Sequence, residues 1–211
     1  MTQATLYNPS QVRSRHHSSA RNAAPICNTV LCLDVSPSMT WALTESISKL
    51  DAARQSLDIM IDGKARNHPG DRIAIVCFSN RASVLSPFRL AADPKLIAAI
   101  SRARTYPSTN ISAGLSLALD LHLQCRGPWH RNIILATDGM PMPPDSPDQV
   151  LATARRALAE RVNIHTVGIG STAHFDPELL KRVASTTHNG RYWHVFDLAS
   201  FTNAIVTAGR M

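Results

Sequence analysis

Hydrophobic positions along the chain follow two spacings, one typical of strands and one typical of helices. Short runs of apolar and often β-branched residues predict strands, because such residues suit the buried, pleated surface of a sheet. These runs cover residues 28–34, 72–79, 83–88, 132–137, 162–169 and 191–196. Residues 1–25 show no hydrophobic period, so we expect a polar, basic, disordered tail there, followed by one domain over residues 26–211.

Helices are predicted between most of these strands. After the first strand, apolar residues recur at helical spacing and predict a helix of about 18 residues, carried by Leu43, Ile47, Leu50, Ala53, Leu57, Met60 and Ile61. An Asp before Pro or Ser-Pro is typical of a capped helix start, and it occurs at Asp93, Asp145 and Asp176. The first of these helices is expected to reach about Ala103. Two further helices are expected over residues 111–124 and 198–207.

The order of these elements predicts the fold class. Strands and helices alternate, which favours an α/β fold with a doubly wound, mostly parallel six-stranded sheet and helices on both faces. The link over residues 79–82 is too short for a parallel crossover, so we expect one antiparallel strand at an edge of the sheet. The continuous apolar run over residues 132–137 predicts a central strand, because such strands are covered on both faces.

Three segments with oxygen side chains are expected to meet where the parallel strands end, the edge at which such sheets bind ligands. They are Asp34-Val35-Ser36-Pro37-Ser38, Ser108-Thr109-Asn110 and Thr137-Asp138-Gly139. Carboxylate and hydroxyl oxygens are ligands that Mg²⁺, Mn²⁺ and Ca²⁺ prefer, and two carboxylates leave such a shell incomplete. Taken alone, an Asp and two Ser after a strand are more often a turn and a helix N-cap than metal ligands.

The order of the three segments resembles the von Willebrand factor type A (VWA) family, whose fold is Rossmann-like. The resemblance covers roughly residues 28–207 and includes the segments 49–54, 69–73, 77–79 and 166–170. It implies a metal-ion-dependent adhesion site (MIDAS) formed by Asp34, Ser36, Ser38, Thr109 and Asp138. In that family the two serines bind the cation directly. The two aspartates act mainly through water and hydrogen bonds, and the threonine binds directly or through water.

The chain departs from the family pattern at two places. Pro37 stands where the family often has Gly, and Tyr106-Pro107-Ser108 replaces a sequence that is usually rich in Gly. Proline restricts the backbone, so we expect both loops to be stiffer than usual without the loss of a ligand. These departures argue against an integrin-like switch between open and closed states.

The resemblance implies a non-enzymatic, metal-dependent protein-binding module, an adaptor or subunit that uses Mg²⁺ (or Mn²⁺ or Ca²⁺) to bind a partner's Asp or Glu. The chain is more similar to prokaryotic (bacterial) members, which often accompany AAA+ ATPases, kinases or phosphatases in stress or antiviral defence systems. Such a component is therefore the expected partner. Two alternatives stay open: a purely structural metal site, and a serine-dependent hydrolase using Ser36 or Ser38, although the Gly-x-Ser-x-Gly pattern is missing.

The amino-acid composition of the chain limits which partners and which cellular compartment we expect. The net charge of +7 comes with only 5% aromatic residues and no clustered basic face, so no specific nucleic-acid binding is expected. No apolar run is long enough to span a membrane or to act as a secretory signal. The four cysteines form no Cys-x-x-Cys pair, and the nine histidines form no His-x-x-x-His pair. We therefore expect a cytoplasmic protein with reduced thiols and with histidines that are structural or solvated.

Overall fold

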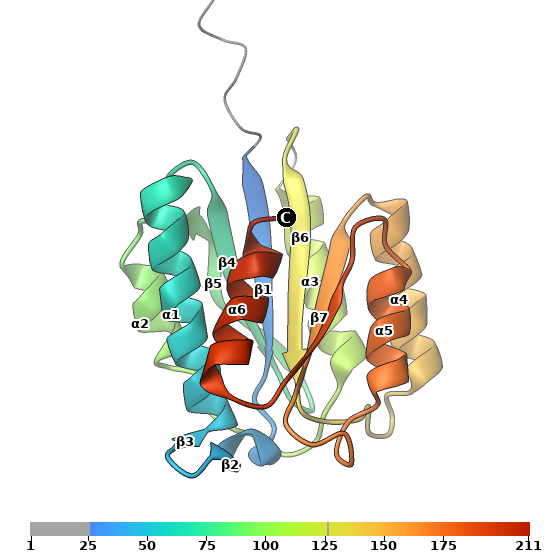
Figure 1. The fold of residues 1–211 in the computed structure, drawn as a ribbon. Coiled ribbons are helices and arrows are strands. Elements are labelled where there is room, and N and C mark those ends of the chain that lie inside the picture. Colours follow the sequence, from blue (N-terminus) through green and yellow to red (C-terminus); the bar gives the residue numbers. More distant parts are fainter. Residues whose placement is uncertain (1–25, 126) are drawn as a thin grey trace, which may run out of the picture.

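A computed structural model describes residues 26–125 and 127–211, so the predicted tail over residues 1–25 lies outside the described residues. Six strands form one mixed sheet with helices on both faces, which confirms the predicted Rossmann-like α/β class (Figure 1). The strands of this sheet are β1 (Cys27–Asp34), β4 (Arg72–Phe78), β5 (Ala82–Leu90), β6 (His130–Thr137), β7 (Asn163–Ile169) and β8 (Tyr192–Val195).

The strand order of the sheet is β5-β4-β1-β6-β7-β8. All neighbouring pairs are parallel except β4 and β5, so the predicted antiparallel strand lies at one edge. Strands β1 and β6 are central, as the apolar run in β6 predicts. Asp34 at the end of β1 pairs with Phe78 of β4, and Leu33 pairs with Ala136 of β6. The carboxyl ends of β4, β1 and β6 therefore lie side by side.

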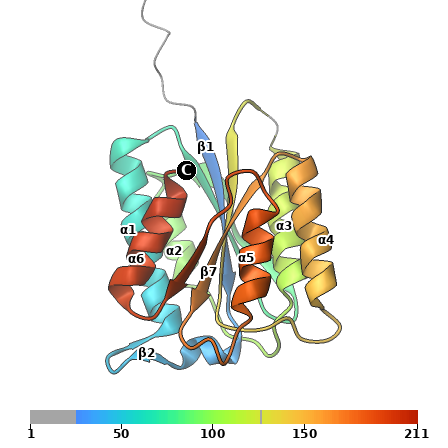
Figure 2. The same cartoon turned by 45° about the vertical axis from the view of Figure 1, so that its right-hand side comes forward.

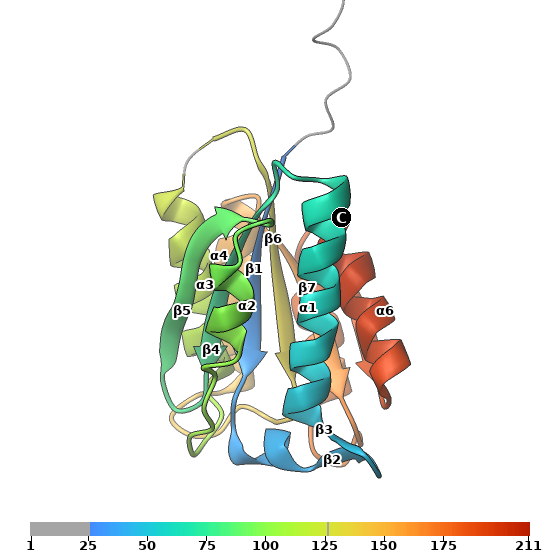
Figure 3. The same cartoon turned by 90° about the vertical axis from the view of Figure 1, so that its left-hand side faces the viewer.

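Within residues 26–125 and 127–211, three helices cover each face of the sheet. Helices α1, α2 and α6 lie on one face and α3, α4 and α5 on the other, an arrangement that the edge-on views show most clearly (Figures 2 and 3). Their bounds are α1 (Lys49–Asn67), α2 (Lys95–Ile100), α3 (Ile111–Gln124), α4 (Pro147–Ala159), α5 (Pro177–Ser185) and α6 (Leu198–Gly209). No helix in the described ranges is both long enough and apolar enough to cross a membrane.

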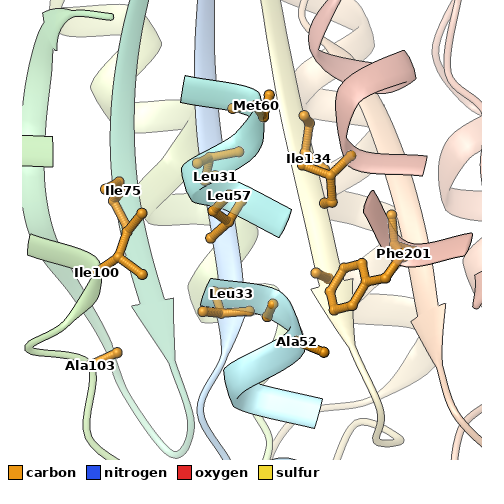
Figure 4. Close-up of a cluster of buried hydrophobic side chains, with 14 of the residues drawn as sticks. Leu31, Leu33, Ala52, Leu57, Met60, Ile75, Ile100, Ala103, Ile134 and Phe201 are labelled. Atoms are coloured by element: carbon orange, nitrogen blue, oxygen red, sulfur yellow. The ribbon is translucent and has the colours of Figure 1, made fainter. Parts of the chain in front are cut away.

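Two hydrophobic layers hold the helices on the sheet. Successive side chains of a strand point to opposite faces, so β1 contributes to both layers. Leu31 and Leu33 pack toward α1 and α6, where Phe201 of α6 also lies (Figure 4). Val30 and Cys32 pack toward α3 and α4 on the other face. This core fixes the strand ends, and with them the loops that carry the candidate site.

The predicted helix start near Leu43 is wrong. Leu43 and Ile47 belong instead to a short antiparallel hairpin, β2 (Ala42–Thr44) and β3 (Ile47–Ser48). Helix α1 begins at Lys49 because the hydroxyl of Ser48 accepts a hydrogen bond from the backbone N–H of Asp51 at 3.1 Å. A side chain that caps the backbone in this way marks the N-terminus of a helix. The hairpin lies at the carboxyl edge of the sheet, at the bottom of Figure 1.

The predicted cap of α2 is also displaced. The N-cap residue is Pro94, not Asp93, and α2 ends at Ile100 rather than Ala103. One carboxylate oxygen of Asp93 accepts from the backbone N–H of Lys95 at 2.9 Å, while the other binds Arg89. Asp93 therefore organises the helix start from one position further upstream. The caps of α4 and α5 lie at Ser146 and Asp176, where the Ser-Pro and Asp-Pro pairs place them.

Among the described residues, His122 and His165 lie inside the core, in line with the structural role expected for them. Burial lowers the pKa of both His122 and His165 to about 4, so both rings are neutral near pH 7. Neither ring nitrogen of His165 has a hydrogen-bond partner in the described part of the chain, and the ring lies 5.9 Å from that of Trp193. Protonating His165 would therefore place an uncompensated charge among apolar groups.

We expect His165→Leu to reduce the acid sensitivity of the fold. Between pH 6.5 and 4 the unfolded chain binds a proton at this histidine and the folded chain does not, so the free energy of unfolding falls as pH decreases, by up to about 3 kcal/mol. Urea unfolding from pH 7 to 4 measures this slope. His188→Gln, at an exposed histidine, serves as the control. An unchanged slope in His165→Leu would contradict the assignment.

Candidate metal centre

Asp34 ends β1 at the carboxyl edge of the sheet, and its side chain is fully buried. The hydroxyl of Thr137, at the end of β6, donates to Oδ2 of Asp34 at 2.5 Å. The backbone N–H of Ser36 donates to Oδ1 at 2.7 Å. The neighbouring strand and the following turn therefore hold this carboxylate in one orientation.

Ser36 and Ser38 are carried by a short 3-10 turn, Pro37–Thr40, that directly follows β1. Ser36 occupies the N-cap position of this turn, but its hydroxyl makes no capping hydrogen bond. Instead, its Oγ lies 3.1 Å from Oγ of Ser38, which donates to Oδ1 of Asp138 at 2.8 Å. The hydroxyls thus face the carboxylates, and capping does not explain this serine pair.

Asp138 directly follows β6 and is fully buried. It also forms an ion pair that the sequence did not predict. Nζ of Lys49, the first residue of α1, lies 2.6 Å from Oδ2 of Asp138. A lysine at a helix N-terminus faces the positive end of the helix dipole, which disfavours it. That local mismatch was the available signal that Lys49 has a partner elsewhere in the fold.

Thr109 lies in the loop before α3 and is almost fully buried. A Cβ on Gly139 would be 3.2 Å from Oγ1 of Thr109 and 3.7 Å from Oδ2 of Asp34, so the glycine leaves room for both side chains. Backbone hydrogen bonds tie the loop to its neighbours, from Tyr106 N–H to Val35 O at 3.0 Å and from Met142 N–H to Thr109 O at 2.9 Å. In the described chain, the Thr109 hydroxyl makes no side-chain hydrogen bond to the other predicted ligands.

The structure therefore places all five predicted residues at the same edge of the sheet. Hydrogen bonds connect Asp34 with the Ser36 backbone and connect Ser36, Ser38 and Asp138 through their side chains. Thr109 lies against Gly139, beside the same carboxylates.

The buried setting of Asp34 shifts the pKa of its carboxyl group. Burial raises the pKa of Asp34 to about 6, and the nearby Asp138 acts in the same direction. Hydrogen bonds from Thr137 and Ser36 lower this pKa but only partly offset burial. A bound cation would stabilise the ionised form of this carboxylate.

The donor set fits a hard divalent cation. Two carboxylates and three hydroxyls offer only oxygen ligands, which suits Mg²⁺, Mn²⁺ or Ca²⁺. Across residues 26–125 and 127–211, no three His, Cys, Asp or Glu side chains group in a way that would hold a metal. A cation here would therefore depend on the serine and threonine hydroxyls as well as on Asp34 and Asp138.

Exposed apolar side chains surround this edge. They lie on the loops that follow the strands or lead into α3, and we call them the apolar rim: Trp41, Tyr106, Met140, Met142 and Phe196. Their exposed fractions run from 46% for Met140 to 63% for Phe196. A polar centre within exposed hydrophobic residues is typical of a protein-contact surface.

Sequence and fold agree on the family of this chain. The family model of the von Willebrand factor type A domain matches residues 28–208. The chain belongs to the VWA family. Domains of this family generally mediate protein–protein interactions. No match to this VWA domain is found among curated proteins.

Solved structures share the fold at low sequence identity. A von Willebrand factor type A protein from Catenulispora acidiphila has a TM-score of 0.75 at 20% identity, with 88% of this chain and 42% of that chain covered. For the PilB minor pilin from Streptococcus sanguinis the TM-score is 0.76 at 15% identity, with 91% and 62% covered. The SpRpn10 VWA domain gives 0.70 at 14% identity, with 86% and 94% covered. This VWA domain thus spans less than two thirds of the first two chains.

Proposed function

We propose that this VWA domain is a non-enzymatic module that binds an Asp or Glu of a protein partner through a cation. The cation would be Mg²⁺, or Mn²⁺ or Ca²⁺, held by Asp34, Ser36, Ser38, Thr109 and Asp138 as an intact MIDAS. The observation that carries the proposal is that two buried carboxylates and two serine hydroxyls lie together at one edge of the sheet, where Ser38 donates to Asp138 and Ser36 makes no capping hydrogen bond.

Each group of residues has a separate task in this proposal. Ser36 and Ser38 present their hydroxyls to the cation, and Thr137 orients Asp34 from the neighbouring strand. A divalent cation with few anionic ligands remains electrophilic, which is the chemistry that a partner's carboxylate needs. The apolar rim would contact the partner around that carboxylate.

The rim and the loop contacts favour partner binding over a purely structural metal. Backbone hydrogen bonds such as Tyr106 to Val35 and Asn110 to Ser79 join the loops directly. A purely structural metal would repeat a connection that these hydrogen bonds already make. An exposed apolar rim has no role in a purely structural site.

The hydrogen bonds of Ser36 and Ser38 support metal binding better than a role as hydrolase nucleophiles. A serine nucleophile needs an adjacent general base, most often a histidine. In the described residues, Ser36 and Ser38 hydrogen-bond each other and Asp138, and no histidine hydrogen-bonds either hydroxyl. This arrangement suits ligands better than nucleophiles.

The wider setting rests on the resemblance alone. We propose a prokaryotic adaptor or subunit in the cytoplasm, whose partner belongs to an AAA+ ATPase, kinase or phosphatase system in stress or defence. Solved relatives include a minor pilin and an aerotolerance-related membrane protein from Bacteroides fragilis, so the fold alone does not select the setting.

A pull-down with the full chain as bait tests the function. We expect partner capture in Mg²⁺ that is lost with a chelator and in Asp34→Ala, and kept in the exposed control Asp120→Ala. Capture that survives both chelation and Asp34→Ala would contradict the proposal. Turnover of an ester or phosphate substrate that disappears in Ser36→Ala would instead favour the hydrolase.

A further inference from the structure

Lys49 is a buried cation inside the candidate metal centre. Its side chain is only 4% exposed, and its Nζ lies 2.6 Å from Oδ2 of Asp138, whose side chain is fully buried. Ser38 binds the other oxygen of the same carboxylate at 2.8 Å. Asp138 is therefore shared between a hydroxyl proposed to bind the cation and the ammonium group of Lys49.

The surroundings of Lys49 keep its ammonium group at this place. Gly170, with a φ of +85°, leaves room for the lysine stem, since a Cβ there would be 3.0 Å from Cε of Lys49. The ring of Trp41 lies with its centroid 5.5 Å from Nζ of Lys49. Trp41 in turn contacts His174 edge-on, at 5.5 Å between ring centroids. The lysine is thus held between two loops and aimed at Asp138.

The charges of these groups have a direct consequence for what the centre binds. Asp34 and Asp138 bring two negative charges, and Lys49 reduces the sum to one. A divalent cation then leaves the loaded centre with one positive charge, which a partner's carboxylate neutralises. Without Lys49 the loaded centre would be neutral, and the same carboxylate would make it negative. Charge sums of this kind matter most at buried sites, where water screens them least.

We propose that Lys49 sets the specificity of the centre by making the metal-loaded form net positive. It weakens binding of the cation to the empty centre and strengthens binding of a carboxylate to the loaded centre. The inference rests on the proposed function, because it concerns the same cation and the same partner group. It assigns the selection of an anionic ligand to a residue that does not itself bind the metal.

Lys64 offers a matched control on the same helix. Its Nζ forms a buried ion pair with Asp71 at 2.5 Å, with both side chains less than 10% exposed. Lys64 lies 15 residues after Lys49, about 22 Å along α1. Lys64→Met therefore breaks the same kind of buried pair far from the centre. It separates a loss of stability from a change in binding.

Calorimetry with Mn²⁺, followed by acetate on the Mn²⁺-loaded protein, measures both effects. In Lys49→Met we expect Mn²⁺ to bind about tenfold tighter or more, and acetate about tenfold weaker, where tenfold corresponds to about 1.4 kcal/mol. Neutral acetamide should not distinguish the proteins. Lys64→Met should leave the affinities for Mn²⁺ and acetate within about twofold of wild type. Lys49→Arg keeps the positive charge, so both of its affinities should be close to those of the wild type. Circular dichroism checks each fold, and Lys49→Gln repeats the test with a polar neutral side chain.

The outcomes separate this inference from the proposed function. If the wild type binds Mn²⁺, and Lys49→Met and Lys49→Gln bind it equally well or more weakly, the proposed role of Lys49 is overturned and the proposed function is not. Binding by the neutral variants but not by the wild type supports the role of Lys49 and overturns the proposed function. Absence of Mn²⁺ binding in all of them overturns both.

Discussion

Asp34→Asn will weaken Mn²⁺ binding by about 10- to 100-fold. The substitution keeps the size of the side chain and removes one of the two negative charges that the centre contributes. Asp34 is fully buried, so this charge acts on a bound cation with little screening by water. The amide also places a donor next to Thr137 or Ser36, both of which donate to the native carboxylate. Calorimetric titration of Mn²⁺ measures the loss.

The loss of Mn²⁺ affinity in Asp34→Asn should not be accompanied by an equally large loss in the free energy of unfolding. Because burial raises the pKa of Asp34 to about 6 from 3.8, the folded chain binds more protons than the unfolded chain between these values. Stability without metal therefore falls as pH rises through this range, and Asp34→Asn removes that fall. Asp71→Asn, at a buried Asp paired with Lys64 on another loop, should lose stability and keep its affinity for Mn²⁺. Equal Mn²⁺ affinity in Asp34→Asn and wild type would contradict a cation at this centre.

Phe201→Ala will lower the free energy of unfolding by about 3–5 kcal/mol. Phe201 is fully buried between α6 and the sheet, where it packs in the same layer as Leu33 and Ile134 (Figure 4). Removing the ring loses apolar burial and leaves a cavity that a rigid sheet can close only in part. Urea unfolding measures the change directly.

Phe196→Ala is the matched control for this prediction. Phe196 is 63% exposed on the apolar rim, so its truncation should change stability by less than about 0.5 kcal/mol. A loss of similar size in both variants would contradict the placement of Phe201 in the core. A normal fold with reduced partner capture in Phe196→Ala would link the rim to binding.

The larger elements could be predicted because their residue patterns are local. Helix α3 (Ile111–Gln124) has the predicted bounds, and the apolar run of β6 is central in the sheet as expected. The β2–β3 hairpin could not be predicted in this way. Its strands have only three and two residues, too few for an alternating pattern to outweigh the helical spacing of Leu43 and Ile47.

The meeting of Asp34 and Asp138 could be predicted from topology, because the carboxyl ends of parallel strands share one edge. The direction of the Ser36 hydroxyl could not, since a serine after a strand serves equally well as a cap. The Lys49–Asp138 pair joins residues 89 positions apart, and the unfavourable place of Lys49 at a helix N-terminus signals a partner without identifying Asp138. What remained unpredicted at this centre is therefore side-chain orientation and charge pairing.

Diffraction from crystals soaked in Mn²⁺, with data collected at the manganese absorption edge, tests the central claim most directly. The account predicts one strong anomalous peak at the carboxyl edge of the sheet, within about 2.0–2.6 Å of the Ser36 and Ser38 hydroxyl oxygens. The peak should be absent from crystals of Asp34→Asn soaked in the same way. No peak at this edge under saturating Mn²⁺, or a peak only elsewhere on the molecule, would contradict a metal-dependent binding site in this protein.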